Sequence, residues 1–211
     1  SGRHKGIGRD LLAAYGLPVA AGGLAATPAQ ALERAQVIGW PVVLKRVAGG
    51  NSDGVITDVA SAGTCTHAAR ELLKGQHAIL VEKQLEGIEL RAHFAGGRIR
   101  EVLRRGRVVA EGDGRRSVRA LVEARQPALM ALAERSPHVR RVLVYRFWSW
   151  GVRCFKDLER VVPPRGARVR IGLTFERRWR TGRAVLIDNP KLEVDFIPRA
   201  AVAVGNVATY G

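Results

Sequence analysis

Along the first 90 residues, the spacing of apolar and polar positions is typical of helices in some segments and of strands in others. Segments with Ala, Leu and Val at helical spacing alternate with short β-branched runs that suit buried strands. Gly16 and Pro18 after the first helix, and Gly39 and Pro41 after the second, are typical helix ends. The predicted elements are, in order, helices at 9–15 and 29–38, a strand at 42–44, a glycine-rich loop at 48–54, a strand at 55–59, a helix at 62–73 and a strand at 79–81. This order predicts a small α+β unit.

The sequence pattern predicts further elements after residue 97. Strands are expected at 97–109 and 162–170, and Ser117 follows an Asp-Gly turn as a helix N-cap rather than as a nucleophile. Aromatic residues are concentrated between arginines over residues 142–155. We expect a pair of core strands there, with stacking on nucleic-acid bases as the alternative.

A carboxylate follows the apolar run at residues 79–81. Glu82 stands at the end of a predicted buried strand, where an unpartnered carboxylate is costly. Glu89 comes seven residues later, with Gly87 between them to let the backbone turn closely. Two acceptors at this spacing could bracket a small ligand rich in hydrogen-bond donors, such as an adenosine.

A glycine-rich loop connects the strands at 42–44 and 55–59. The backbone N–H groups of such a loop can approach phosphates closely, and Lys45 supplies a positive charge at its base. An ordinary hairpin turn with a surface lysine is the alternative for this motif on its own.

The net charge restricts the classes of partner. The chain has 35 Lys and Arg against 19 Asp and Glu, a formal net charge of +16, which favours nucleotides, nucleic acid, acidic peptides or anionic membranes. The basic residues are mostly scattered arginines rather than a long basic tail, which argues against nucleic acid.

Cysteine, histidine and hydropathy patterns predict no metal site built from Cys or His and no membrane segment. Cys65 and Cys154 are far apart and form no C-x-x-C motif, so we expect two free thiols in a reducing cytoplasm. The five histidines show no metal-binding spacing. No apolar run approaches the roughly 20 residues needed to span a bilayer.

Four motifs in this order resemble those of the ATP-grasp superfamily, which includes D-alanyl-D-alanine ligase. The resemblance implies the α+β ATP-grasp fold, in which two small subdomains clasp a nucleotide. It extends from Lys5 to about Gln126 and weakens afterwards. The motifs are Lys5 ahead of Gly16-Leu17-Pro18-Val19, Val42-Val43-Leu44-Lys45, the loop Gly49 to Gly54, and Val81-Glu82-Lys83-Gln84-Leu85-Glu86-Gly87-Ile88-Glu89.

The resemblance implies a role for each motif. Lys5 and Lys45 would contact the ATP phosphates, and the loop amides would cover the β- and γ-phosphates. Glu82 would accept from the adenine amine, the backbone after it would meet the purine edge, and Glu89 would hold the ribose hydroxyls. Val43 and Leu85 would form apolar walls above and below the base. The expected cofactor-binding residues are Lys5, Lys45, Gly49, Gly50, Ser52, Gly54, Val55, Glu82, Lys83, Leu85 and Glu89.

Two later segments resemble cyanophycin synthetases and glutathione-synthetase-like ligases. They are Gly112-Asp113-Gly114 with Ser117-Val118, and the segment from Val162 to Arg170. In this subgroup Arg91 and one of Arg104 or Arg105 would contact phosphate or an anionic acyl substrate, and we assign catalytic roles to Arg91 and Arg105. Solvated arginines on exposed strand faces are the alternative.

The resemblance implies an ATP-dependent carboxylate–amine ligase that forms an amide bond on an amino acid or peptide through an acylphosphate, with ATP and Mg²⁺. Asp188, Glu193 and Asp195 carry oxygens suited to Mg²⁺ but not the family's spacing, so no metal ligand is assigned. We expect the nucleotide-binding region at 1–125 and a divergent part of the core at 126–211. A homo-oligomer and a larger multidomain ligase are both compatible assemblies. The alternative function is a catalytically silent nucleotide-binding or nucleic-acid-binding basic module.

Overall fold

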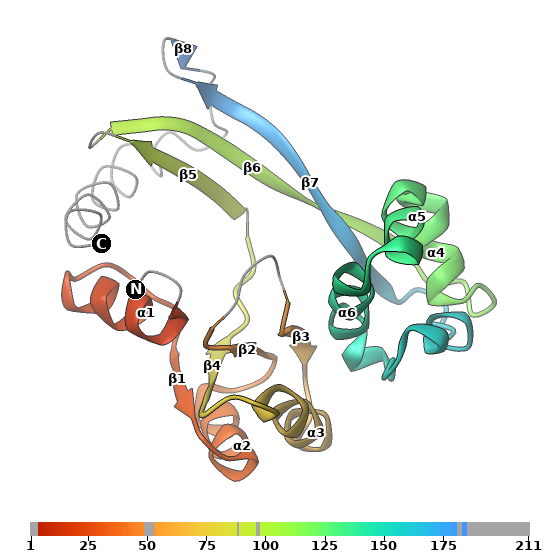
Figure 1. The fold of residues 1–211 in the computed structure, drawn as a ribbon, viewed down its shortest axis with the longest axis horizontal. Coiled ribbons are helices and arrows are strands. Elements are labelled where there is room, and N and C mark those ends of the chain that lie inside the picture. Colours follow the sequence, from red (N-terminus) through yellow and green to blue (C-terminus); the bar gives the residue numbers. More distant parts are fainter. Residues whose placement is uncertain (1–3, 49–52, 88, 96–97, 181–182, 185–211) are drawn as a thin grey trace.

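The computed structural model describes residues 4–48, 53–87, 89–95, 98–180 and 183–184. Figure 1 shows two separate sheets, with a group of helices beside one end of the second. Each sheet has four described strands, in the orders β1-β4-β2-β3 and β5-β6-β7-β8. The mixture of helices with antiparallel sheets confirms the α+β class.

The first sheet contains the strands on which the predicted nucleotide motifs lie. Its strands pair antiparallel, with β4 between β1 and β2. Helices α2 and α3 pack against it. The elements of this unit are α1 (Lys5–Ala14), β1 (Gly22–Ala25), α2 (Pro28–Ile38), β2 (Val42–Arg46), β3 (Val55–Val59), α3 (Ala62–Leu73) and β4 (Ile79–Lys83).

Side-chain caps explain where the helices of this unit begin. The Thr27 hydroxyl accepts from the Gln30 amide and is the N-cap of α2. Helix α3 begins after Ser61 and spans the predicted range. Helix α1 begins four residues before the predicted start, because His4 Nδ1 accepts from the Ile7 amide.

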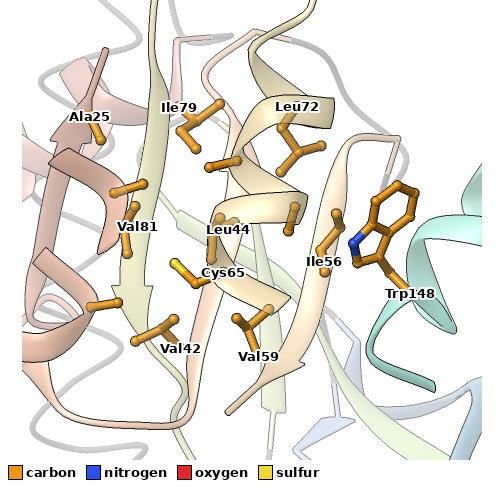
Figure 2. Close-up of a cluster of buried hydrophobic side chains, with 14 of the residues drawn as sticks. Ala25, Val42, Leu44, Ile56, Val59, Cys65, Leu72, Ile79, Val81 and Trp148 are labelled. Atoms are coloured by element: carbon orange, nitrogen blue, oxygen red, sulfur yellow. The ribbon is translucent and has the colours of Figure 1, made fainter. Parts of the chain in front are cut away.

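The first core lies between the sheet and helices α2 and α3. Figure 2 shows Val42 and Leu44 of β2 and Val81 of β4 beside Cys65 of α3, while Trp148 reaches the same cluster from the other unit. These strand residues are completely buried. The strands therefore provide a rigid base for the polar residues at their ends.

The second unit consists of a long hairpin with a helical group at one end. The Ser117 hydroxyl caps α4 by accepting from the Ala120 amide, which confirms the predicted N-cap. Helices α4, α5 and α6 surround a second core. The elements are β5 (Glu89–Ala95), β6 (Arg98–Glu111), α4 (Val118–Arg125), α5 (Pro127–Arg135), α6 (Pro137–Arg146), the 3₁₀ turns η1 (Trp148–Trp150) and η2 (Phe155–Glu159), β7 (Arg168–Arg180) and β8 (Arg183–Ala184).

The predicted strand pair at 142–155 is wrong, because this segment is the end of α6 followed by η1 and η2. Leu143 and Phe147 are buried in the second core, while Tyr145 and Trp148 are buried in the first. Burial on two faces makes this short helical segment almost continuously apolar, and a short apolar run is also typical of a buried strand. Val144 packs against both cores, so α6 joins the two units. The predicted division at residue 125 stays a prediction.

Candidate nucleotide-binding site

A cavity of about 420 Å³ lies where the first sheet, the segment after β4 and the second unit meet. Its volume is within the range typical of small-molecule sites. Acidic and basic side chains share the wall with apolar ones. The lining residues are Ala20, Val43, Lys45, Val55, Thr57, Glu82, Lys83, Gln84, Leu85, Glu89, Arg107, Val142, Arg146, Arg170 and Gly172.

Glu82 and Lys45 form an ion pair on the wall given by the first sheet. Lys45 Nζ lies 2.5 Å from Glu82 Oε2, and Arg9 Nε lies 3.8 Å from Oε1. The Glu82 side chain is only 10% exposed. A carboxylate at this depth needs such a partner, as the sequence predicted. The pair holds both charges at the cavity wall.

The central position of β4 allows little space beside Glu82. In the sheet register Glu82 stands opposite Gly22 of β1 on one side and Val43 of β2 on the other. A Cβ atom on Gly22 would lie 2.2 Å from the Val81 carbonyl oxygen and 2.8 Å from Glu82 Cα. A glycine is therefore needed at position 22 for β1 to approach β4.

Side-chain contacts fix the segment that follows β4. Lys83 Nζ donates to the carbonyls of Gly39 and Trp40 at 3.0 and 2.8 Å. The buried side-chain amide of Gln84 donates from Nε2 to Asp58 Oδ1 at 2.8 Å. Its Oε1 accepts from the Asp58 backbone N–H at 2.7 Å. Asp58 has a φ of 59°, an uncommon conformation for a residue other than glycine. These contacts hold the segment against the ends of β2 and β3.

Two arginines of the cavity lining, both from the second unit, pair with Glu86, a carboxylate that is not itself part of the lining. Arg107 Nη1 lies 3.1 Å from Glu86 Oε2, and Arg170 Nη2 lies 3.1 Å from Glu86 Oε1. Arg107 also donates to the Leu85 carbonyl at 3.4 Å, and Arg170 Nη1 lies 3.3 Å from Asp58 Oδ1. The hydrogen bond from Arg107 is the main cause that lowers the pKa of Glu86 below 4.5, and contacts with Arg170 also contribute.

Six of the eleven predicted nucleotide-binding residues line this cavity. They are Lys45, Val55, Glu82, Lys83, Leu85 and Glu89. Lys5 is not in the lining: its ammonium donates to the Arg46 carbonyl at 3.0 Å. Burial and the nearby charge of Lys45 lower the pKa of Lys5. Two cations near each other are suited to a common anion.

The other predicted residues are beside the cavity or outside the described residues. Gly54 has a φ of +69° and its carbonyl accepts from the Arg46 amide at 2.8 Å, so it closes the loop between β2 and β3. Arg91 is on β5 and Arg105 on β6, where Arg105 stands opposite Glu89 in the register. Their side chains lie outside the described part, and so do Gly49, Gly50 and Ser52.

Several lining residues were not predicted from the sequence. Arg107 and Arg170 belong to segments that the motifs singled out, but nothing in their spacing indicated that they meet one carboxylate. Val142 and Arg146 come from α6, which was expected to be a strand. Only the packing of α6 between the two cores brings them to the cavity.

The described residues contain no group of three or more His, Cys, Asp or Glu side chains that could hold a metal ion. The acidic residues considered for Mg²⁺, Asp188, Glu193 and Asp195, lie outside the described residues. Among the helices that the structure describes, none is long and apolar enough to cross a membrane. The two cysteines are free thiols, as predicted, with Cys65 buried and Cys154 exposed.

A family model described as an ATP-grasp domain matches residues 5–103. This match, which covers nearly half of the chain, includes Lys45, the loop after it and the segment from Glu82 to Glu89. The family model therefore confirms the resemblance of these motifs to the ATP-grasp superfamily over residues 5–103.

Curated relatives match shorter segments. A succinate–CoA ligase [ADP-forming] subunit beta of Chloroflexus aggregans is 57% identical over 42 residues, which are 20% of this chain and 11% of the relative. The corresponding subunit of Chloroflexus aurantiacus is 42% identical over 73 residues, 33% of this chain and 19% of the relative. The chain thus spans less than a fifth of the length of these relatives.

Solved structures with similarity to the chain include two of the ligase types that its motifs resemble. A D-alanine–D-alanine ligase from Bacillus anthracis has a TM-score of 0.43 and 15% identity, covering 96% of this chain and 62% of that protein. A bifunctional glutathione synthetase from Pasteurella multocida has a TM-score of 0.32 and 17% identity, covering 82% and 25%.

Proposed function

We propose that the cavity binds an adenine nucleotide and that the chain is the nucleotide-binding part of an ATP-dependent ligase. The observation that carries the proposal is the meeting of Lys45, Glu82 and Glu89 in one cavity with the backbone of residues 83–85. These groups match the parts of a nucleotide: a cation for phosphate, and carboxylates for an amine and for ribose hydroxyls. Val43 and Leu85 supply apolar surface for the base.

The ion pair between Lys45 and Glu82 is compatible with this role. Removing one partner of a buried pair is costly because it leaves a charge without compensation. A nucleotide would instead give each partner a replacement, with phosphate oxygens for Lys45 and the adenine amine for Glu82. The charges can then separate without either becoming unpaired. Lys5 is a second nearby cation. Burial and the charge of Lys45 lower its pKa, and a phosphate beside both lysines would stabilise their charged forms.

The proposed reaction is supported by the match to the ATP-grasp domain model rather than by the cavity alone. In the proposed first step a substrate carboxylate oxygen attacks the γ-phosphorus of ATP, which gives an acylphosphate and ADP. In the second step an amine attacks the acyl carbon and releases phosphate, and an amide bond forms. The excess of cations over carboxylates in the lining supports an anionic substrate. The described residues supply no Mg²⁺ site, so no step is assigned to the metal.

Calorimetric titration with ADP and with adenosine tests the nucleotide site. We expect ADP to bind, and Lys45→Met and Glu82→Gln to weaken binding by at least tenfold. Lys74→Met is a matched control, because Lys74 also pairs with a glutamate, at 2.6 Å, but on the exposed end of α3. Absence of heat with ADP in the wild-type chain would contradict the proposal.

The acceptor and the alternative function need separate measurements. Phosphate release from ATP and Mg²⁺ should require a carboxylate together with an amino acid or peptide amine. Release that requires a thiol such as coenzyme A would instead point to thioester formation. Salt-sensitive binding of single-stranded nucleic acid with which ADP does not compete would support the nucleic-acid-binding alternative.

A further inference from the structure

Glu86 is not among the residues that line the cavity, but its carboxylate pairs with two arginines that are. Arg107 and Arg170 come from the neighbouring strands β6 and β7 and contact different oxygens of the Glu86 carboxylate, each at 3.1 Å. Both arginine side chains are 31% exposed, whereas Glu86 is 72% exposed. Both cations line the cavity, whereas the Glu86 carboxylate is largely exposed and lies outside the lining.

Any anion between the two arginines would stabilise them, not the Glu86 carboxylate alone. Two guanidinium groups that converge on one point repel each other when nothing negative lies between them. Arg170 is partly compensated by Asp58, 3.3 Å away, and Arg107 donates to the Leu85 carbonyl. These contacts keep the guanidinium groups oriented even if the Glu86 carboxylate moves away.

Displacing Glu86 would cost little. An ion pair with a largely exposed partner contributes little to stability, because water and salt compensate the freed charge. The Glu82 pair is different, since its carboxylate is only 10% exposed. A ligand oxyanion with two oxygens can take the place of Glu86 and form the same two charge-assisted hydrogen bonds.

We propose that Arg107 and Arg170 form an oxyanion subsite of the cavity and that Glu86 is an internal competitor occupying it until a ligand arrives. The inference rests on the proposed function for the identity of the ligand. Its chemistry is a carboxylate or phosphoryl group, supplied by the acyl substrate or by the nucleotide. The position of Glu86 therefore lowers the affinity of the subsite for that group.

The test compares Glu86→Gln with the wild type by calorimetry, using ADP, adenosine, succinate and inorganic pyrophosphate as probes. Removing the competing charge should strengthen binding of the oxyanion by roughly two- to fivefold, the equivalent of one exposed ion pair. A gain with ADP and pyrophosphate assigns the subsite to the nucleotide. A gain with succinate alone assigns it to the acyl substrate. Adenosine, which has no oxyanion, should bind with unchanged affinity.

Two further variants separate this effect from bulk charge and from folding. Glu159→Gln makes the same charge change at a glutamate that is 62% exposed and pairs with Arg119, outside the cavity lining, and it should give no gain. In an Arg107→Ala background Glu86→Gln should give no gain either, because one arm of the subsite is missing. Thermal unfolding of each variant shows that it is folded.

The outcomes distinguish this inference from the proposed function. Equal affinities of Glu86→Gln and wild type for all four probes would overturn the inference, and so would an equal gain in Glu159→Gln. Binding of ADP without any effect of Glu86→Gln would leave the nucleotide site intact and overturn the subsite alone. A gain for pyrophosphate or succinate in a chain that binds neither ADP nor adenosine would support the subsite and overturn the nucleotide proposal.

Discussion

Glu82 and Glu86 lie four residues apart on one segment, and both pair with cations of the same cavity, yet their surroundings differ. Glu82 is on the central strand β4, between β1 and β2, with a side chain that is 10% exposed. Glu86 follows the strand and is 72% exposed. The same type of ion pair is therefore part of the rigid wall at one position and an exchangeable contact at the other.

The difference comes from the strands rather than from the charges. The strands on both sides of Glu82 are fixed by the sheet register and by the core below them. Glu86 is held to the second unit by ion pairs with two arginine side chains. A comparison of variants at the two positions and of the core beneath them should therefore separate the rigid part of the site from the adaptable part.

The largest expected effect is the difference in thiol reactivity between Cys65, which lies in the core beneath Glu82, and Cys154. Cys65 is completely buried, and burial raises the pKa of its thiol to about 11, whereas Cys154 is exposed. Because the thiolate is the reactive form, a thiol reagent at pH 8 should label Cys154 at once and Cys65 orders of magnitude more slowly. Mass spectrometry of the labelled peptides measures both rates. Similar rates at the two cysteines would show that the first core opens readily.

Glu82→Ala should destabilise the fold. It leaves Lys45 without its partner at the cavity wall, and we expect a loss of about 2–4 kcal/mol, below the full value for a buried pair because Lys45 is 30% exposed. Denaturant unfolding measures the change. Glu86→Ala should alter stability by less than about 1 kcal/mol. Equal losses at the two positions would contradict the distinction drawn between them.

Gly22→Ala should disturb the same wall through the backbone. The added Cβ would lie 2.2 Å from the Val81 carbonyl oxygen, so β1 must move away from β4 at a cost of about 1–3 kcal/mol. Gly8→Ala is the matched control, because a Cβ there meets nothing within 4 Å on helix α1 and should stabilise by up to about 1 kcal/mol. Unfolding midpoints of both variants decide whether the space beside Glu82 is as restricted as the register implies.

The smallest expected effect concerns Glu86 and acid. Its pKa is lowered below 4.5 in the folded chain, so its ion pairs stabilise the fold above that pH and lose their effect as the pH falls through the folded-state pKa. The difference in unfolding free energy between wild type and Glu86→Gln should be a few tenths of a kcal/mol at pH 7, after allowance for solvent screening, and vanish near pH 2. A difference that grows on acidification would reverse the sign of this linkage.

Local patterns determined much of the first unit. The β-branched runs predicted β2, β3 and β4, and side-chain caps fixed the starts of α2 and α3, as one also does for α4 in the second unit, because both signals act over a few residues. The motif from Val81 to Glu89 also indicated a nucleotide site, and the family match confirms its superfamily. The exception is α6, whose two buried faces gave a misleading strand pattern.

The sequence by itself thus indicated the α+β class, the resemblance to the superfamily and six of the residues that line the cavity. Only the tertiary structure decided that Lys45 pairs with Glu82, that Arg107 and Arg170 converge on Glu86, and that α6 completes the cavity wall. The physical reason is distance along the chain. Caps and strand runs depend on neighbouring residues, whereas these contacts join residues up to 84 positions apart and exist only when both cores have formed.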